Sequence, residues 1–158
     1  MRPTDSSDRL AERHLDLTDE AATASLARRV ARPREAGDVI ALKGDLGTGK
    51  TLFARAFIGE EDVPSPTFTL VQTYDRPAGR IWHFDLYRLK DPAEAVELDI
   101  EDAFAEGISL IEWPERLGSL LPAERLEVAF EFASEPSRRR VRLSGRGRWA
   151  ALLAEVGA

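Results

Sequence analysis

The chain has no cysteine and only two histidines among its 158 residues. Disulfide bonds and thiolate metal sites are therefore excluded, and two histidines are too few for a histidine-rich metal site. The sequence also lacks any run of about 18 apolar residues that would span a membrane, and residues 1–17 lack the apolar stretch of a signal peptide. These absences predict a cytoplasmic protein that makes no use of a membrane.

The chain also lacks a net positive charge. The 22 lysines and arginines are outnumbered by 28 aspartates and glutamates, which gives a net charge of −6. Such a chain has no overall positive field with which to hold a polyanion. We therefore expect any role in nucleic-acid metabolism to be indirect.

The residues that are present are those of an ordinary globular domain. Hydrophobic residues make up 43% of the chain and charged residues 32%, and 158 residues suffice for one domain with its own core. Residues 1–12 show no apolar period and are predicted to be a flexible N-terminal arm, which leaves residues 13–158 for the domain. The hydrophobic pattern predicts an α/β fold with a mixed central sheet flanked by helices. Strands are expected at 39–42, 68–74, 81–87, 108–111, 125–132 and 138–143, and helices at 19–32, 51–58, 91–104 and from 147 onward.

Two local patterns make finer predictions. Thr18 is predicted to cap the first helix, because Asp19 and Glu20 suit the positive first turn that would follow it. In the strand expected at 125–132, apolar residues alternate on one face, and the turn that follows predicts a hairpin with the next strand. This face consists of Leu126, Val128, Phe130 and Phe132.

The segment GDLGTGKT at residues 44–51 matches the phosphate-binding pattern G-x-x-x-x-G-K-[ST], between an expected strand and an expected helix. Glycines let the backbone fold tightly and point successive N–H groups at phosphate oxygens, and the helix N-terminus adds partial positive charge. Lys50, one of only three lysines, is expected to reach the β- and γ-phosphates, and Thr51 to offer its hydroxyl to Mg²⁺. The nucleotide is therefore predicted to contact Leu46, Gly47, Thr48, Gly49, Lys50 and Thr51.

Two acidic residues are candidates for the metal partner of this loop. Asp85 and Glu112 each follow a short apolar run and so stand at or near the end of an expected strand. Ligands of an open α/β sheet gather at that edge. Either carboxylate can hold Mg²⁺ directly or through water, or orient the water that attacks the γ-phosphate. The competing interpretation is an acid in a turn, paired with an arginine such as Arg88 or Arg116.

Three other features of the sequence favour structural roles. His83 is predicted to be a hydrogen-bonded core or edge residue rather than a catalyst. Trp113 is expected to pack against the fold, with stacking on a base or a partner as the alternative. The arginine run at 138–140 is predicted to be solvated, although one member of a hairpin with alternating faces is able to reach a phosphate.

Four motifs stand in order along the chain: GDLGTGKT (44–51), SPTFTLV (65–71), HFDLYRL (83–89) and EWPERL (112–117). In this order and at these separations they resemble the TsaE (YjeE) family, the small P-loop ATPase of bacterial tRNA threonylcarbamoyladenosine biosynthesis. The resemblance covers roughly residues 15–145. It implies a single-domain P-loop NTPase fold with ATP and Mg²⁺ as ligands.

The resemblance also implies roles for individual residues. Thr51 and Glu112 would be the magnesium pair, and Asp85 would be a Walker-B-like acid. Thr67 would lie in a switch-like loop, Ser65-Pro66-Thr67, near the γ-phosphate. With Lys50, these residues form the implied catalytic set of Lys50, Asp85, Glu112 and Thr67.

Nucleotide contacts and partners follow from the same resemblance. Glu20 falls where the family contacts the adenosine side of the nucleotide, and Arg138 falls near another nucleotide contact. The implied activity is ATP hydrolysis, slow in the isolated chain, in support of the TsaB and TsaD proteins. These partners attach the threonylcarbamoyl group to the adenosine next to the anticodon of tRNAs that read ANN codons. The chain would thus meet tRNA only through that complex.

Three rival interpretations of the loop exist. A small-molecule P-loop kinase is the main alternative, but it needs a lid rich in phosphate-clamping arginines, and no such segment follows the central strands. A GTPase would carry an Asn-Lys-x-Asp motif, which is absent. A nucleotide-dependent interaction module with negligible turnover overlaps the family interpretation, because isolated members are expected to turn over slowly until partners order the switch loop.

Overall fold

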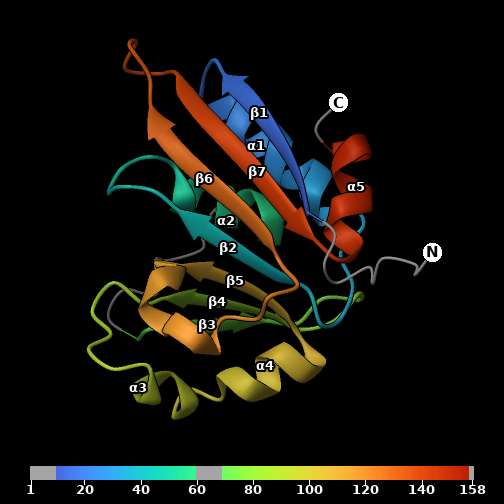
Figure 1. The fold of residues 1–158 in the computed structure, drawn as a ribbon, viewed down its shortest axis with the longest axis vertical. Helices are drawn as coiled ribbons and strands as arrows, with labels where there is room; N and C mark the ends of the chain where they lie inside the picture. The colour runs from blue at the N-terminus through green and yellow to red at the C-terminus, as the bar shows by residue number, and fades with distance from the viewer. Residues whose placement is uncertain (1–9, 60–68, 157–158) are drawn as a thin grey trace, which may run out of the picture.

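The computed structural model describes residues 10–59 and 69–156, and the strands of this part form one mixed seven-stranded sheet (Figure 1). The strands are β1 Leu10–Leu17, β2 Val39–Lys43, β3 Val71–Tyr74, β4 Ile81–Asp85, β5 Ile108–Glu112, β6 Leu126–Phe132 and β7 Arg139–Arg146. Their order across the sheet is β1-β7-β6-β2-β5-β4-β3. The pairs β2–β5, β2–β6 and β4–β5 are parallel, whereas β1–β7, β6–β7 and β3–β4 are antiparallel. The predicted α/β fold with a mixed sheet is confirmed.

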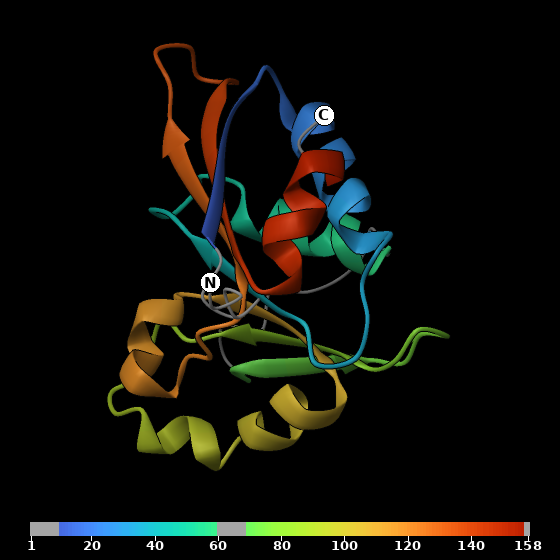
Figure 2. The ribbon, with the colours of Figure 1, turned by 45° about the vertical axis from the view of Figure 1, so that its right-hand side comes forward.

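Helices cover both faces of the centre of the sheet but only one face of its β1-β7-β6 side. The helical segments are α1 Glu20–Ala31, α2 Lys50–Ile58, α3 Ala93–Val96, α4 Ile100–Glu106, the 3-10 segment η2 Pro114–Leu120 and α5 Arg148–Val156. Helices α1, α2 and α5 lie on one face, and α3, α4 and η2 lie beyond β3, β4 and β5 on the other (Figure 1). Figure 2 shows that no described helix covers the other face of β1, β7 and β6. Among the described helices, none has the length and apolarity needed to cross a membrane.

Two clusters of buried side chains correspond to these two layers. One contains Phe53 of α2 and Trp149 of α5, and the other contains Ile100 of α4. Leu110 and Ile111, neighbours on β5, belong to different clusters. Successive side chains of a strand point to opposite faces, so an uninterrupted apolar run indicates a strand buried on both sides. This explains why β5 is apolar apart from Ser109 and its last residue, Glu112.

Helix α1 is capped by a different residue from the one predicted. Asp19 has an extended backbone, and its Oδ1 accepts a hydrogen bond from the backbone N–H of Ala22 at 2.9 Å. The prediction of Thr18 as N-cap was therefore wrong by one position. Both residue types cap helices, so composition alone does not choose between neighbours. As a result Glu20 is the first residue of the helix.

Strand β1 begins inside the segment predicted to be a flexible arm. It pairs with β7 from Leu10, opposite Arg146, to Leu17, opposite Arg139. Residues 10–12 are therefore part of the sheet, while residues 1–9 lie outside the described part of the chain. The strand escaped prediction because it is an edge strand in which Arg13 and other charged residues interrupt the apolar alternation, although Ala11, Leu15 and Leu17 contact the core.

The alternating apolar residues of β6 lie on one face, and its predicted hairpin with the next strand is confirmed. Leu126, Val128 and Phe130 are buried, but Phe132 is 53% exposed. Its ring lies 4.9 Å from the guanidinium carbon of Arg139 on β7. A cation–π contact therefore takes the place of core packing at Phe132.

The parallel centre of the sheet brings three chain segments together at one edge. Strands β2, β4 and β5 run in the same direction, so their carboxyl ends meet. In the register of these strands, Glu112 lies beside Leu42 on one side and beside Asp85 on the other. The glycine-rich loop starts directly after β2. Both predicted acids, Asp85 and Glu112, thus lie at the same edge of the sheet as the start of that loop.

Candidate functional site

The loop between β2 and α2 is shaped by its glycines. Gly44 has a φ of +145° and Gly49 a φ of +116°, conformations that side chains strongly disfavour. A Cβ on Gly44 would lie 2.6 Å from Thr48 Oγ1 and 2.9 Å from the carbonyl oxygen of Phe130. The loop therefore closes tightly on itself and on β6, and only glycine fits at its start.

Lys50, the first residue of α2, turns back onto this loop. Its Nζ donates a hydrogen bond of 2.5 Å to the carbonyl oxygen of Gly44 and lies 3.5 Å from the centroid of the Trp113 ring. Only 4% of the residue is exposed. Burial lowers the pKa of the Lys50 ammonium, and the negative charge of Glu112 works against that shift. The lysine that is predicted to bind phosphate is thus a buried cation near a carboxylate.

Thr51 and Glu112 are joined by a hydrogen bond. The Thr51 hydroxyl donates to Glu112 Oε1 at 3.1 Å, with Oε2 at 3.4 Å. Glu112 is almost fully buried, and its Oε2 lies 2.7 Å from Nε2 of His83, which is also buried. The two residues that the family resemblance pairs as magnesium ligands are therefore in contact across 61 positions of sequence. His83 is a hydrogen-bonded core residue, as predicted, but its partner is the candidate metal ligand.

Asp85 stands next to this cluster at the end of β4. It is 5% exposed, and its Oδ1 accepts a hydrogen bond of 3.1 Å from the backbone N–H of Tyr87. A cavity of about 360 Å³ opens in front of the carboxylates. The cavity is lined by Leu46, Gly47, Gly49, Lys50, Thr51, Asp85, Tyr87, Arg88, Glu112 and Trp113. The structure thus brings most of the predicted site residues to one cavity.

A second cavity of about 470 Å³ lies along the same loop. Thr48 lines it together with Gly47 and Gly49, which border both cavities. Glu20, in the first turn of α1, also lines this cavity. Its predicted contact with the adenosine side of the nucleotide would need such a position beside the loop. The loop thus separates a cavity rich in carboxylates from one that is reached from α1 and from the β6–β7 turn.

The arginine beside the loop is Arg139 and not the predicted Arg138. Arg139 donates from Nε to the carbonyl oxygen of Thr48 at 3.1 Å and from Nη2 to that of Gly47 at 3.4 Å. Arg138 instead pairs with Asp16 of β1 at 2.6 Å. Neighbours on a strand point to opposite faces, so a register error of one residue exchanges their roles. Among the described residues, Arg139 lines the cavity that Glu20 borders, and Arg138 does not.

Trp113 occupies a strained position above the lysine. Its φ is +62°, which is uncommon for a bulky residue, and its ring centroid lies 5.0 Å from that of Tyr87. Trp113 packs against the buried cluster that contains Ile100, as predicted, and its contact with Lys50 also makes it part of the wall of the site. Strain of this kind concentrates at functional sites.

The oxygen atoms of the site suit a magnesium ion. Thr51 offers a hydroxyl, and Glu112 and Asp85 offer carboxylates, all of which are ligands that Mg²⁺ accepts. In the described part of the chain, no three His, Cys, Asp or Glu side chains form a group that would hold a metal by themselves. This fits an ion that takes one or two protein ligands and completes its shell with water and phosphate oxygens. Thr67 and the rest of the predicted switch-like loop at 65–67 lie outside the described residues.

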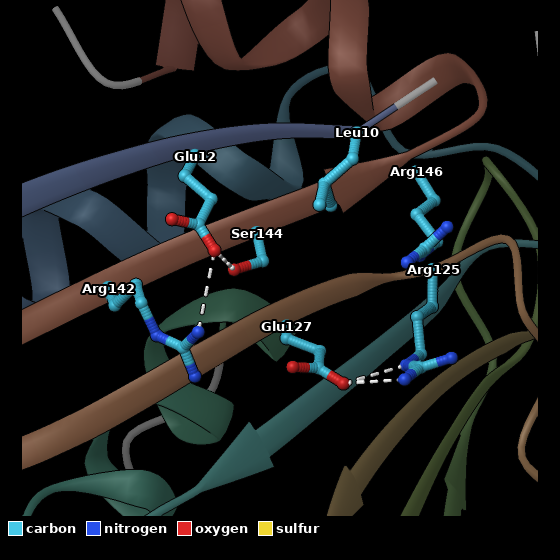
Figure 3. Close-up of a pocket in the computed structure, with 7 residues that line it drawn as sticks. All are labelled: Leu10, Glu12, Arg125, Glu127, Arg142, Ser144 and Arg146. Atoms are coloured by element: carbon cyan, nitrogen blue, oxygen red, sulfur yellow. Dashed lines mark hydrogen bonds and ion pairs between the residues drawn. The ribbon is translucent and has the colours of Figure 1, made fainter. Parts of the chain in front are cut away.

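A third cavity lies far from the loop, on the uncovered face of β1, β7 and β6 (Figure 3). Four of its five charged side chains form two ion pairs: Arg142 lies 3.5 Å from Glu12, and Arg125 lies 2.7 Å from Glu127. Figure 3 shows these pairs lying along the sheet surface rather than converging on one point. The arrangement is that of a solvated strand face with no candidate chemistry.

Comparisons with known proteins agree with this geometry. A sequence model of the family described as "Threonylcarbamoyl adenosine biosynthesis protein TsaE" matches residues 17–141. The matched range includes every residue that lines the two cavities along the glycine-rich loop.

Individual relatives and one solved structure extend the match. A protein of Rickettsia bellii named "tRNA threonylcarbamoyladenosine biosynthesis protein TsaE" is 41% identical over 127 residues, covering 77% of this chain and 88% of its own. A Bacillus subtilis protein of the same name is 37% identical over 120 residues, covering 73% and 75%. The crystal structure of Bacillus subtilis YdiB superposes with a TM-score of 0.76 at 28% identity, over 94% of this chain and 95% of that one.

Proposed function

Because this chain belongs to the TsaE family, and with it to tRNA threonylcarbamoyladenosine biosynthesis, we propose that it is a magnesium-dependent ATPase of that process. The observation that carries this proposal is the contact between Thr51 and Glu112 beside Lys50, at the end of a glycine-rich loop. A hydroxyl, a buried carboxylate and a buried ammonium together suit a metal-bound triphosphate.

Lys50 and the loop provide the anion site. The ammonium now bonds to the carbonyl oxygen of Gly44, a weak acceptor compared with a phosphate oxygen. A triphosphate in the loop would take over that donor, and the backbone N–H groups at the start of α2 would add further donors. Binding therefore exchanges a neutral acceptor for a charged one at the same ammonium.

Thr51 and Glu112 would hold the magnesium ion, which neutralises charge on the β- and γ-phosphates when bound. In the structure the Thr51 hydroxyl donates to Glu112. Their contact keeps both oxygen ligands on the same side of the site. Asp85, one strand further along, would accept a proton from the attacking water or orient it. Thr67 completes the proposed catalytic set.

The cavity between α1 and the β6–β7 turn would take the adenosine side. Glu20 and Arg139 both line it, and Arg139 is bonded to the loop backbone at Thr48 and Gly47. With the triphosphate in the loop and the carboxylates beyond it, the nucleoside would extend toward this cavity. This deepens the family expectation at Glu20 and moves the expected arginine from Arg138 to Arg139.

The partner proteins TsaB and TsaD are part of the proposal. Trp113 rests on the lysine and on Tyr87, so a triphosphate has to displace the indole before Lys50 is free. Such a closed site would turn over slowly alone, and a partner that draws Trp113 away would accelerate it. We place the chain in the cytoplasm, where it would reach tRNA only through this complex.

Reconstitution tests the proposal. ATP hydrolysis by the chain should be slow alone and should rise when TsaB and TsaD are added, in parallel with threonylcarbamoylation of an ANN-decoding tRNA. The matched control is the chain with Lys50→Ala, which should stimulate neither reaction. A hydrolysis rate that ignores the partners, together with phosphate transfer to a small molecule, would support a P-loop kinase instead.

A further inference from the structure

His83 is a fully buried histidine in the middle of β4 with one hydrogen-bond partner. Its Nε2 lies 2.7 Å from Glu112 Oε2. Its Nδ1 is buried and has no hydrogen-bond partner among the described residues. Strand β4 pairs in parallel with β5, so His83 and Glu112 lie on neighbouring strands near the same edge of the sheet.

We propose that His83 is a positioning residue, which holds the Glu112 carboxylate in the orientation needed to bind the metal ion of the nucleotide. This inference rests on the proposed function, since it assumes that Glu112 is a ligand of magnesium. It adds a residue that does not touch the nucleotide or the ion.

The argument begins with the two oxygens of Glu112. Oε1 accepts from the Thr51 hydroxyl at 3.1 Å, and Oε2 is taken by His83 at 2.7 Å. Two partners on opposite oxygens fix both the position of the carboxylate and the plane in which it lies. The shorter contact, to His83, leaves Oε1 directed at the hydroxyl with which it would share the ion.

The unpartnered Nδ1 identifies which atom carries the proton. A buried N–H without an acceptor costs about 1–3 kcal/mol, and a neutral imidazole has a single N–H. A proton on Nδ1 would leave that donor unpaired and would also set the Nε2 lone pair against the carboxylate. The proton therefore belongs on Nε2, and His83 donates to Glu112.

Metal ligands in proteins depend on such partners. Hydrogen-bond donors behind a ligating side chain orient it, and their removal commonly lowers metal affinity by about 10- to 100-fold. Glutamate has three side-chain torsions to restrict, so a fixed donor removes much of its freedom before the ion arrives. A histidine that merely filled space in β4 would affect folding stability and leave the ion affinity of the folded protein unchanged.

The test compares His83→Gln with His83→Phe. The glutamine Nε2 stands as many bonds from Cβ as the histidine Nε2, so it can keep the donor, whereas phenylalanine fills a similar space without one. For each folded variant, Mg²⁺ is titrated calorimetrically into the complex with a non-hydrolysable ATP analogue. Affinity for the analogue is measured separately in EDTA.

We expect His83→Phe to weaken Mg²⁺ binding by about 10- to 100-fold, with analogue affinity in EDTA changed less than twofold. His83→Gln should stay within about threefold of the unaltered chain in both measurements. Unchanged Mg²⁺ affinity in His83→Phe, or equal weakening in both variants, overturns the proposal. If His83→Phe does not fold, His83→Leu takes its place. The proposal is also overturned if His83→Gln binds Mg²⁺ as weakly as Glu112→Gln does.

The failure of the proposed function has a different signature. If the unaltered chain binds the analogue but shows no separate Mg²⁺ affinity, Glu112 is not a metal ligand and the proposed function fails together with this inference. If the unaltered chain binds Mg²⁺ and the His83 variants do so equally well, only the positioning role is lost.

Discussion

The parallel centre of the sheet and its antiparallel β1-β7-β6 side use charged residues in opposite ways. In the centre, Lys50, Asp85 and Glu112 are 4%, 5% and 3% exposed and converge on one cavity. On the uncovered antiparallel face, Arg142 and Glu12 pair at 3.5 Å with both side chains 44% exposed. The first group gives up hydration, and the second keeps it.

The two groups of charged residues differ in their energetic cost. Removing charges from water costs several kcal/mol per ion, and a buried cluster is weak support for stability. Exposed pairs, by contrast, cost little and contribute about 0–1 kcal/mol. Burial of three ionisable groups at one sheet edge therefore indicates a site that a charged ligand completes. The open face needs no such explanation.

The largest expected effect comes from removing the buried cation. Lys50→Ala should lower ATP affinity by about 100-fold, because the charged hydrogen bonds of a lysine to phosphate contribute about 1.5–3 kcal/mol and have no substitute. Isothermal titration calorimetry measures this loss, and circular dichroism checks the fold. The matched control on the antiparallel side is Arg142→Ala, which should bind ATP normally. Equal affinity in the two variants would erase the contrast between the regions.

Next in size is the effect of the buried carboxylate. Glu112→Ala should reduce Mg²⁺-dependent turnover by about 10- to 100-fold while affinity for ATP without metal changes little, because the lost ligand serves the ion. Steady-state assays over a range of Mg²⁺ concentrations reveal the difference. An equal loss of turnover and of metal-free binding, or of neither, contradicts a role in metal binding.

A smaller effect is expected at the aromatic cover of the site. Nucleotide binding should change tryptophan fluorescence, because the Trp113 ring lies 3.5 Å from the lysine that a phosphate must reach. The change should vanish in Trp113→Phe, while ATP affinity stays within about fivefold. Trp82 and Trp149 do not line the cavity and serve as internal controls. If the fluorescence change on nucleotide binding persists in Trp113→Phe, another tryptophan is responsible for it and the prediction for Trp113 is wrong.

Asp38 sharpens the comparison, because it is a buried charge outside the site. Both of its oxygens accept from Nη1 of Arg148, at 2.6 and 2.7 Å. Burial raises its pKa above the ordinary value of 3.8 despite this partner. The folded chain therefore holds the Asp38 proton more tightly than the unfolded chain does. This carboxyl contributes stability below pH 3.8 that is lost as the pH rises through its raised pKa.

Urea denaturation from pH 3.5 to 6 follows this effect. In Asp38→Asn the free energy of unfolding should rise with pH more steeply than in the unaltered chain, by at most about 1.4 kcal/mol per pH unit for one proton. ATP affinity of the folded variant should be unchanged. A shallower slope in Asp38→Asn would mean that the pKa is lowered in the folded chain.

The smallest effect belongs to the open face. Glu12→Gln should change the free energy of unfolding by less than about 1 kcal/mol, since its pair with Arg142 is exposed and water competes for both groups. Raising the salt concentration should reduce even that difference. Chemical denaturation at low and high salt provides the comparison. A loss of several kcal/mol would show that this face is not merely solvated.

The sequence was sufficient for those parts of the site that depend on local pattern. The glycine loop, Lys50 and Thr51 follow from residue spacing, and Asp85 and Glu112 follow from their places after apolar strands. Because parallel strands bring their carboxyl ends to one edge, strand-end acids were predictable without knowing the order of the strands.

What escaped prediction depends on register and on long-range contacts. Arg138 and Arg139 differ by one position in a hairpin, and only the pairing of β6 with β7 decides which faces the loop. The sequence predicts His83 to be a core histidine, because no residue near it in sequence indicates that Glu112 is its hydrogen-bond partner. Likewise, no periodicity reveals that Trp113 would take a left-handed backbone conformation and lie over Lys50.

The central claim is that the loop, Lys50 and the Thr51–Glu112 pair form a site for magnesium and ATP. A calorimetric titration of ATP into the chain, with and without Mg²⁺, tests it most directly. The account predicts saturable binding of one ATP per chain that Mg²⁺ strengthens in the unaltered protein but not in Glu112→Gln. Binding that ignores both Mg²⁺ and Glu112→Gln, or no binding at all, would contradict it.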